Sequence, residues 1–318
     1  MFSISRISEN GFDKIILANE ITGCRAEILP GCGAILNAFI IKKIDNEINI
    51  IEGYETAEDF DKNFEAKGFR SAKLSPFVCR LKGGNYLFGK TNYQVSSFYL
   101  GKHAIHGLIY KAAFRVSKFK KSKKSAFAEL EYKYREAGKG FPFAYNCIIR
   151  YELKTGNRLV ITTCIVNKGK SAMPITDGWH PYFSFGKKID DIEMRLRVKK
   201  MLEFDEELIP TGKLLPNRKF KDFTPIGAAV FDNCFSINPQ YKTVLQLRDR
   251  TALLQLNIKP ASAYPYLQLY TPDHRGSIAV ENLSAAPDAF NNRMGLLVLK
   301  KGEKKIFRTE YDVKKIKP

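Results

Sequence analysis

Alternation of apolar and polar residues is the feature of this 318-residue sequence that most restricts its fold. Apolar side chains recur at every second position in several separate runs. A period of two residues places such side chains on one face of a β-strand, whereas a helix needs a period near 3.6. We therefore expect a chain built mainly of strands, and the runs lie at Ala126–Tyr134, Cys147–Leu153, Leu159–Ile165, Ile192–Val198, Leu245–Leu247 and Leu254–Ile258.

The stretches between these runs carry turn residues. Lys154-Thr155-Gly156-Asn157 separates two runs, and glycine and asparagine tolerate the positive φ of a tight hairpin turn. Arg248-Asp249-Arg250-Thr251 separates another pair of alternating runs. The lysine-rich stretch Lys118–Lys124 also lies between two such runs, so we expect it to be a third hairpin tip. One short helix is expected at Glu55–Asn63. No linker rich in Ser, Gly or Pro divides the chain. We predict an all-β fold, a large antiparallel sandwich or barrel, with residues 1–318 forming a single domain.

The formal net charge of +19 has two interpretations. We favour a solvated basic surface; the alternative is attraction to anions, such as nucleic acid, an acidic membrane surface or a phosphorylated substrate. No helix-turn-helix, zinc-finger or RNA-recognition motif supports a nucleic-acid partner. No apolar stretch has the length of a membrane span, and no secretory leader is visible, so we expect no membrane partner and a cytoplasmic location. The sequence leaves the oligomeric state open.

Several kinds of reactive site lack support. None of the six cysteines forms a CxxC pair, and for Cys147 and Cys164, which lie in alternating runs, we expect buried thiols rather than a catalytic thiol. The motifs of nucleophilic serine, P-loop, dinucleotide-binding and zinc-protease sites are missing. His103 and His106 have a spacing that could bind a metal on a helix, but glycines flank them in what we interpret as a loop entering a strand. With no carboxylate nearby in sequence, we expect no metal site.

His180 lies in the segment TDGWHPYFSFG, which also carries the single tryptophan of the chain. The following Pro181 favours an extended backbone at the histidine. One interpretation is a proton-transfer group in a sugar site, where rings stack on the sugar and imidazole exchanges protons near neutral pH. The other is a hydrogen-bonded histidine in an aromatic core, and this segment alone does not decide between them. We expect four rings to surround the imidazole, those of Trp179, Tyr182, Phe183 and Phe185.

Glu281 and Arg80 also have two interpretations each. Glu281 follows the apolar run Ile278–Val280, and a carboxylate there is costly unless it is paired or functional. It is either an inward-facing Glu held by an arginine or a general base whose pKa is raised by partial burial. Arg80 ends the short stretch Pro76–Cys79, just before a Gly-Gly turn, and has the same ambiguity.

The order of these segments resembles that of the aldose 1-epimerase, or galactose mutarotase-like, family. Each block alone is a weak signal, but their common order across most of the chain is fairly specific. The similar blocks are, in order, ILPGCGAILNAFI, FRSAKLSPFVCRLKGGNYLFGKTNYQV, AIHGLIY, TDGWHPYFSFG, FDNCFSI, YLQLYTPD, AVENLSAAPDAFN and LLVLKKGEKKIFRTEYDV.

The resemblance implies a galactose mutarotase-like supersandwich, a large antiparallel β-sandwich that binds a sugar across one concave face. It also implies an isomerase that interconverts the α and β anomers of a hexose or hexose phosphate. Carried over block by block, His180 would be the general acid and Glu281 the general base. Two such groups on opposite sides of the ring suffice for ring opening and reclosure of a free sugar, with no metal or nucleotide cofactor.

The same resemblance implies substrate-binding roles. Arg80 and His106 would contact hydroxyls or the ring oxygen, and Asp232 and Gln268 would hold further hydroxyls. This chain has Gly178-Trp179-His180-Pro181-Tyr182 where the galactose-specific branch commonly has Asn-His-Ser-Tyr-Phe. The segment between the Gln and Glu blocks is also shorter than in that branch. The chain is therefore more similar to the broader branch, which includes hexose-6-phosphate mutarotases.

Two other classes of function stay open at this point. A non-catalytic carbohydrate-binding protein would use the aromatic residues and Arg80, but it would not need His180 and Glu281 as a proton-transfer pair. A glycosidase or lyase on a related sandwich would need two carboxylates about the scissile bond, which Asp232 and Glu281 could supply.

Overall fold

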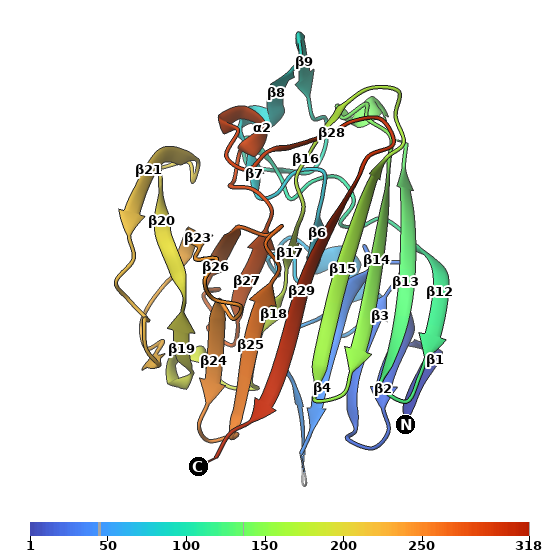
Figure 1. Cartoon of the computed structure of the whole chain (residues 1–318), viewed down its shortest axis with the longest axis vertical. Helices are drawn as coiled ribbons and strands as arrows, with labels where there is room; N and C mark the ends of the chain where they lie inside the picture. The colour runs from blue at the N-terminus through green and yellow to red at the C-terminus, as the bar shows by residue number, and fades with distance from the viewer. Residues whose placement is uncertain (44–45, 136, 318) are drawn as a thin grey trace.

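The chain folds into antiparallel β-sheets packed in layers (Figure 1). The computed structural model describes residues 1–43, 46–135 and 137–317. Every ladder between named strands in these ranges is antiparallel, which confirms the predicted all-β class. No helix in these ranges is long and apolar enough to cross a membrane. Helical segments in the described ranges are α1 (Ala57–Asn63), α2 (Ala289–Asn292) and the short 3-10 turns η1 (Lys82–Gly84), η2 (Ala137–Lys139) and η3 (Ile189–Asp191).

One layer is a long sheet that the last strand of the chain completes. Its first strands follow one another as hairpins, and β29 then inserts between β15 and β25 (Figure 1). This insertion joins the two halves of the sheet, which come from distant parts of the sequence. The strands, in spatial order, are β12 (Arg115–Lys121), β13 (Ser125–Tyr134), β14 (Tyr145–Lys154), β15 (Arg158–Asn167), β29 (Lys304–Lys315), β25 (Leu254–Pro260), β24 (Leu245–Asp249), β19 (Glu193–Leu196) and β22 (Thr224–Pro225).

The second layer begins with a sheet formed by the N-terminal strands. These strands follow one another in chain order and pack behind the β12–β15 side of the long sheet (Figure 1). The tyrosine of β14 links the layers, because the Tyr151 hydroxyl donates a hydrogen bond of 2.6 Å to the Ala34 carbonyl oxygen. The strands are β1 (Phe2–Glu9), β2 (Phe12–Asn19), β3 (Cys24–Leu29), β4 (Ile35–Lys42) and β5 (Glu47–Asn49).

A further sheet of the second layer carries most of the predicted site residues. It packs on the long sheet through Phe183, whose ring meets that of Tyr311, and through Asn282, which donates a 3.0 Å hydrogen bond to Thr309. A bridge between Ile51 and Phe183 connects it with the N-terminal sheet. In spatial order its strands are β21 (Pro210–Pro216), β20 (Val198–Phe204), β23 (Asp232–Ile237), β26 (Tyr266–Tyr270), β27 (Ile278–Leu283), β17 (Gly178–His180) and β6 (Ala72–Leu74), with β18 (Tyr182–Phe183) also on β27.

Short ladders surround one end of this sheet. The chain enters α1 through Thr56, whose hydroxyl accepts the Asp59 amide at 3.0 Å, and the predicted helix at 55–63 is thereby confirmed. The short strands are β7 (Arg80–Leu81), β11 (His103–Ile105) and β10 (Tyr99–Leu100) in one ladder, β8 (Asn85–Phe88) with β9 (Thr91–Gln94), and β16 (Met173–Ile175) with β28 (Leu297–Leu299).

The predicted hairpins are present, with one shift of boundary. Strands β14 and β15 meet at the expected turn, where Gly156 has φ 76° and Asn157 has φ 52°. Strands β24 and β25 form the second hairpin, although Arg248 and Asp249, expected in the turn, still belong to β24. Pairing with β25 extends that strand further than the pattern of apolar residues indicated.

Three sequence expectations need correction. The run Ile192–Val198 is not one strand, because the chain leaves the long sheet after Leu196 and enters the other sheet at Val198. The lysine-rich stretch Lys118–Lys124 is not wholly a hairpin tip, since it is part of β12 as far as Lys121. Cys164 is only half-buried, because its position on β15 faces outward, whereas Cys147 is buried as expected.

Candidate active site

The six side chains predicted for a sugar site line one pocket of about 360 Å³. They come from strands and loops that are far apart in the sequence, and the sheet of β23, β26, β27 and β17 brings most of them together. A cavity of this size lies in the range of small-molecule sites. The six residues are Arg80, His106, His180, Asp232, Gln268 and Glu281.

Strand register places three of these side chains in a row. Gln268 on β26 lies directly opposite Glu281 on β27, and β23 lies on the other side of β26. The Gln268 amide nitrogen donates a 2.7 Å hydrogen bond to Oδ1 of Asp232. Burial raises the pKa of Asp232, and the nearby Arg80 guanidinium opposes that shift. The row presents an amide and two carboxyl groups to the pocket.

His180 and Glu281 are in direct contact at the buried floor of the pocket. The imidazole Nε2 lies 3.3 Å from Oε1 of Glu281, and their side chains are 6% and 3% exposed. Burial lowers the pKa of His180 to about 4. Burial, followed by the charge of Asp232, raises the pKa of Glu281 well above its usual value. Burial therefore disfavours the charged form of both groups, the imidazolium of His180 and the carboxylate of Glu281.

His106 completes the group beside this pair. Its ring meets the His180 ring edge-on, with centroids 4.9 Å apart, and burial lowers its pKa. It does not lie in a loop entering a strand, as expected, but directly after β11, where its φ is 60°. Within the described residues, Nδ1 of His106, Nδ1 of His180 and Oε1 of Gln268 are buried without a hydrogen-bond partner. A buried polar atom without a hydrogen-bond partner destabilises the fold unless a ligand supplies the missing hydrogen bond.

The same group of side chains has the spacing of a metal site. Donor atoms of His106, His180 and Glu281 all lie within 4.8 Å of one another in the described structure. The carboxylate beside His106 is Glu281, which is far from the histidine pair in the sequence and is brought close by the fold. His103 is not part of the group, because its Nδ1 accepts the amide of Gly83. Two imidazoles and a carboxyl could hold a divalent ion, and they could equally transfer protons.

The aromatic residues around His180 are arranged differently from the expectation. Tyr182 stacks on the imidazole, with centroids 5.2 Å apart, and lines the pocket. Trp179 points to the opposite side of β17, where its ring lies 4.5 Å from the Lys73 ammonium. Phe183 also packs in the core, and Phe185 lines a different groove. Alternation along a strand explains why consecutive residues cannot all face one side chain.

Sequence reasoning missed several residues of the pocket. Phe69, Cys79 and Leu208 line it, and each has a positive φ, as His106 does. Non-glycine residues rarely adopt this conformation, and such strain concentrates at functional sites. Positive φ at these positions leaves no signal in a single sequence. The Cys79 thiol was the easiest to find, because it directly precedes Arg80.

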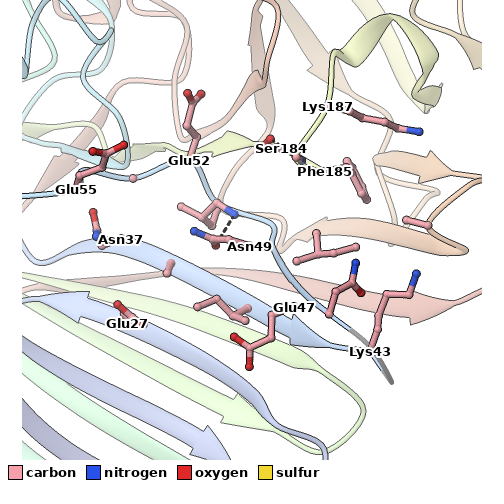
Figure 2. A pocket seen from close by; sticks show the side chains of 18 of the residues that line it. Glu27, Asn37, Lys43, Glu47, Asn49, Glu52, Glu55, Ser184, Phe185 and Lys187 are labelled. Atoms are coloured by element: carbon pink, nitrogen blue, oxygen red, sulfur yellow. Dashed lines mark hydrogen bonds between the residues drawn. The ribbon is translucent and has the colours of Figure 1, made fainter.

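A larger groove of about 1060 Å³ lies beside the segment that follows β18 (Figure 2). Figure 2 shows Glu52, Ser184, Phe185 and Lys187 in the upper part of the view and Glu47 and Lys43 below them. None of the six predicted residues lines it. Two asparagines of its wall are bonded within the protein: Asn49 accepts the Ile51 amide at 3.1 Å, and Asn37 accepts the Tyr54 amide at 2.8 Å. These internal bonds make it a less suitable ligand site than the smaller pocket.

Comparison with known proteins agrees with this geometry. The family model described as aldose 1-epimerase matches residues 13–312. The chain is 27% identical over 240 residues to an uncharacterized protein, YihR, of Escherichia coli strain K12, a match that covers 72% of this chain and 74% of the relative.

Solved structures share the fold over the full length. A galactose mutarotase-like protein from Clostridium acetobutylicum has a TM-score of 0.86 at 20% identity, covering 99% of both chains. A galactose 1-epimerase from Lactobacillus acidophilus NCFM has a TM-score of 0.85 at 17% identity, covering 100% of both chains. These matches confirm the predicted galactose mutarotase-like sandwich. Because the family model spans nearly the whole sequence, the chain belongs to the aldose 1-epimerase family, a family of isomerases.

Proposed function

We propose that this protein interconverts the α and β anomers of a free, uncharged aldohexose, with His180 and Glu281 as its proton-transfer pair. The observation that carries the proposal is the 3.3 Å contact between the imidazole Nε2 and the Glu281 carboxyl in a pocket of small-molecule size. A site that merely bound sugar would not need two titratable groups in contact at its floor. Mutarotation needs two proton-transfer groups, because one proton leaves the C1 hydroxyl as another reaches the ring oxygen.

The protonation state of the pair suits this reaction. Starting from protonated Glu281 and neutral His180, the forms that burial favours, transfer of one proton across their contact produces an imidazolium and a carboxylate. The carboxylate then takes the proton of the C1 hydroxyl while the imidazolium protonates the ring oxygen, and the C1–ring oxygen bond breaks. Rotation about C1–C2 exposes the other face of the aldehyde, and reversal of the same steps closes the ring.

The remaining pocket side chains would hold the sugar. The Arg80 guanidinium supplies fixed donors for the oxygen on which negative charge develops. Gln268 and Asp232, already linked to each other, would accept and donate hydrogen bonds to ring hydroxyls, and His106 would meet another. The ring of Tyr182 offers an apolar face beside the imidazole.

The charges around the pocket favour an uncharged sugar over a phosphosugar. Arg80 is the one Lys or Arg side chain that lines the described pocket, and it shares that wall with the carboxyl groups of Asp232 and Glu281. Lys82 and Lys102, beyond the rim, are both engaged by Glu207. A phosphate would therefore meet little unpaired positive charge.

A panel of anomerically pure aldoses and aldose 6-phosphates, followed by polarimetry or NMR, tests this proposal. We expect acceleration of anomer exchange for at least one free aldohexose, a lower kcat/KM for the 6-phosphate, and little dependence on salt. A higher kcat/KM for the phosphate that falls steeply with salt would contradict the choice of an uncharged substrate. No acceleration with any aldose, phosphorylated or not, would contradict the activity itself.

A further inference from the structure

Cys79 is a pocket-lining residue whose side chain contacts the Glu281 carboxyl. Its Sγ lies 3.8 Å from Oε2 of Glu281, whereas the other oxygen, Oε1, lies 3.3 Å from His180. The two oxygens of the carboxyl thus have different neighbours, a thiol on one side and an imidazole on the other. A thiol is a weak hydrogen-bond donor, and burial raises the pKa of the Cys79 thiol, so that it keeps its proton.

The backbone at Cys79 is held in a conformation that costs energy. Its φ is 49°, in the left-handed region, which is unfavourable for an L-residue and which glycine enters freely. In this conformation the Cys79 carbonyl oxygen accepts the His106 amide at 2.9 Å. The residue therefore anchors one pocket side chain through its backbone and touches another through its thiol. A side chain retained where glycine would be easier points to a use for that side chain.

From these contacts we infer that Cys79 is a positioning residue for the general base, donating its thiol hydrogen to Oε2 of Glu281 so that Oε1 faces His180 and the substrate. This inference rests on the proposed function, in which Glu281 must become a carboxylate. Cys79 forms no bond to the sugar and exchanges no electrons. Its thiol hydrogen bond stabilises the carboxylate that appears when the carboxyl proton moves to the imidazole.

The electrostatic consequence has a definite sign. Burial and the charge of Asp232 raise the pKa of Glu281, whereas the hydrogen bond from Cys79 and the charge of Arg80 lower it. The other titratable groups nearby are His180, in contact with Oε1, and His106, whose donor atom lies within 4.8 Å. Glu281 also helps to raise the pKa values of Tyr182 and of the buried Cys234 thiol. Removing the Cys79 thiol therefore raises the pKa of Glu281 and depletes the reactive ion pair.

Three substitutions at one position separate positioning from packing. Cys79→Ala should lower kcat about 5-fold with little change in KM, because one hydrogen bond to the carboxylate is lost, and it should move the alkaline limb of the pH–rate profile upward. Cys79→Ser retains a donor and should recover at least half of that shift. Cys79→Gly removes the donor and the backbone strain together, so it should match or exceed wild-type stability while its kcat falls like that of Cys79→Ala. Wild-type kcat and pH profile in the Ala and Gly variants would overturn the inference.

A second measurement tests the contact between Cys79 and Glu281 independently of the proposed function. Because the Glu281 charge raises the pKa of the Cys79 thiol, Glu281→Gln should speed alkylation of Cys79 by iodoacetamide several-fold at alkaline pH, as read by mass spectrometry. Half-buried Cys164, on the other layer, serves as the internal reference and should react at an unchanged rate. A wild-type protein without mutarotase activity would overturn the proposed function and leave this readout intact. Unchanged alkylation of Cys79 in Glu281→Gln would overturn the link between the two residues.

Discussion

A buried ion pair behind the pocket gives a sharp prediction about stability. Lys73 and Asp177 are both fully buried, with the ammonium 2.6 Å from Oδ2 of the carboxylate. The ammonium also donates to the Gly178 carbonyl oxygen at 3.0 Å and lies over the Trp179 ring, and the Tyr264 hydroxyl donates to Oδ1 of Asp177 at 2.7 Å. Through its hydrogen bond to Gly178, Lys73 thus stabilises the short strand β17, on which His180 faces the pocket.

Substituting Lys73→Met keeps the length of the side chain and removes the charge. Asp177 would keep the Tyr264 hydrogen bond but lose its counter-charge in a site without water contact. Removal of one partner from a buried pair costs about 3–5 kcal/mol, a large part of the roughly 5–15 kcal/mol that stabilises a typical domain. Burial already raises the pKa of Asp177, and loss of Lys73 raises it further. Because the carboxyl can then protonate, the cost of the substitution should shrink as pH falls.

Urea unfolding followed by tryptophan fluorescence measures this effect, since the chain has a single tryptophan and it lies on Lys73. Circular dichroism serves as a second probe of the same transition. The double variant Lys73→Met/Asp177→Asn is the control and should regain about half of the lost free energy or more, because no unpaired charge remains. A loss below about 1 kcal/mol, or an equal loss with Asp177→Asn already present, would refute the claim that the pair is coupled.

Further predictions concern the backbone, the pocket and pH. Gly107 has φ 83°, and a Cβ there would lie 2.1 Å from the Ser75 carbonyl oxygen. Gly107→Ala should therefore lower the melting temperature and, by displacing the adjoining His106, raise KM. An unchanged melting temperature and KM would argue against the close approach. Arg80→Ala should lower kcat about 10²-fold, as measured by polarimetry. An increase in KM with kcat unchanged would instead assign Arg80 to substrate binding alone. Activity should fall as pH drops through about 4, where His180 becomes charged, and again as pH rises through the raised pKa of Glu281, where the pair loses its proton. Since the folded-state pKa of His180 lies below its usual 6.5, stability should fall as pH drops from 6.5 toward 4, and His180→Asn should lessen that fall in pH-dependent unfolding.

Local chemistry allowed much of the fold to be predicted. The hairpin at Gly156 and Asn157 is encoded by two adjacent residues that tolerate positive φ, and α1 is encoded by its cap at Thr56. Long-range features are not encoded locally. Nothing in the β29 sequence specifies that it inserts between β15 and β25, and nothing in the alternating run at Ile192–Val198 marks the corner at which the chain changes sheets.

The sequence pointed to some members of the candidate site and to none of its contacts. The order of sequence blocks named six residues that line the pocket, but it missed others, such as Phe69 and Leu208. The contact of His180 with Glu281 depends on β17 and β27 pairing side by side, which no spacing in the sequence reveals. Trp179 was expected beside the imidazole and instead lies on Lys73, because neighbouring residues on a strand face opposite sides.

The most direct test of the central claim is anomer exchange by the proton-transfer pair. Exchange between the α and β anomers of an accepted free aldose, followed by NMR at neutral pH, should be accelerated by the wild-type protein. His180→Asn and Glu281→Gln should each lower that acceleration by about 10²–10⁴-fold while circular dichroism shows the fold unchanged. A purified, folded double variant that retains full activity would contradict the assignment of the pair.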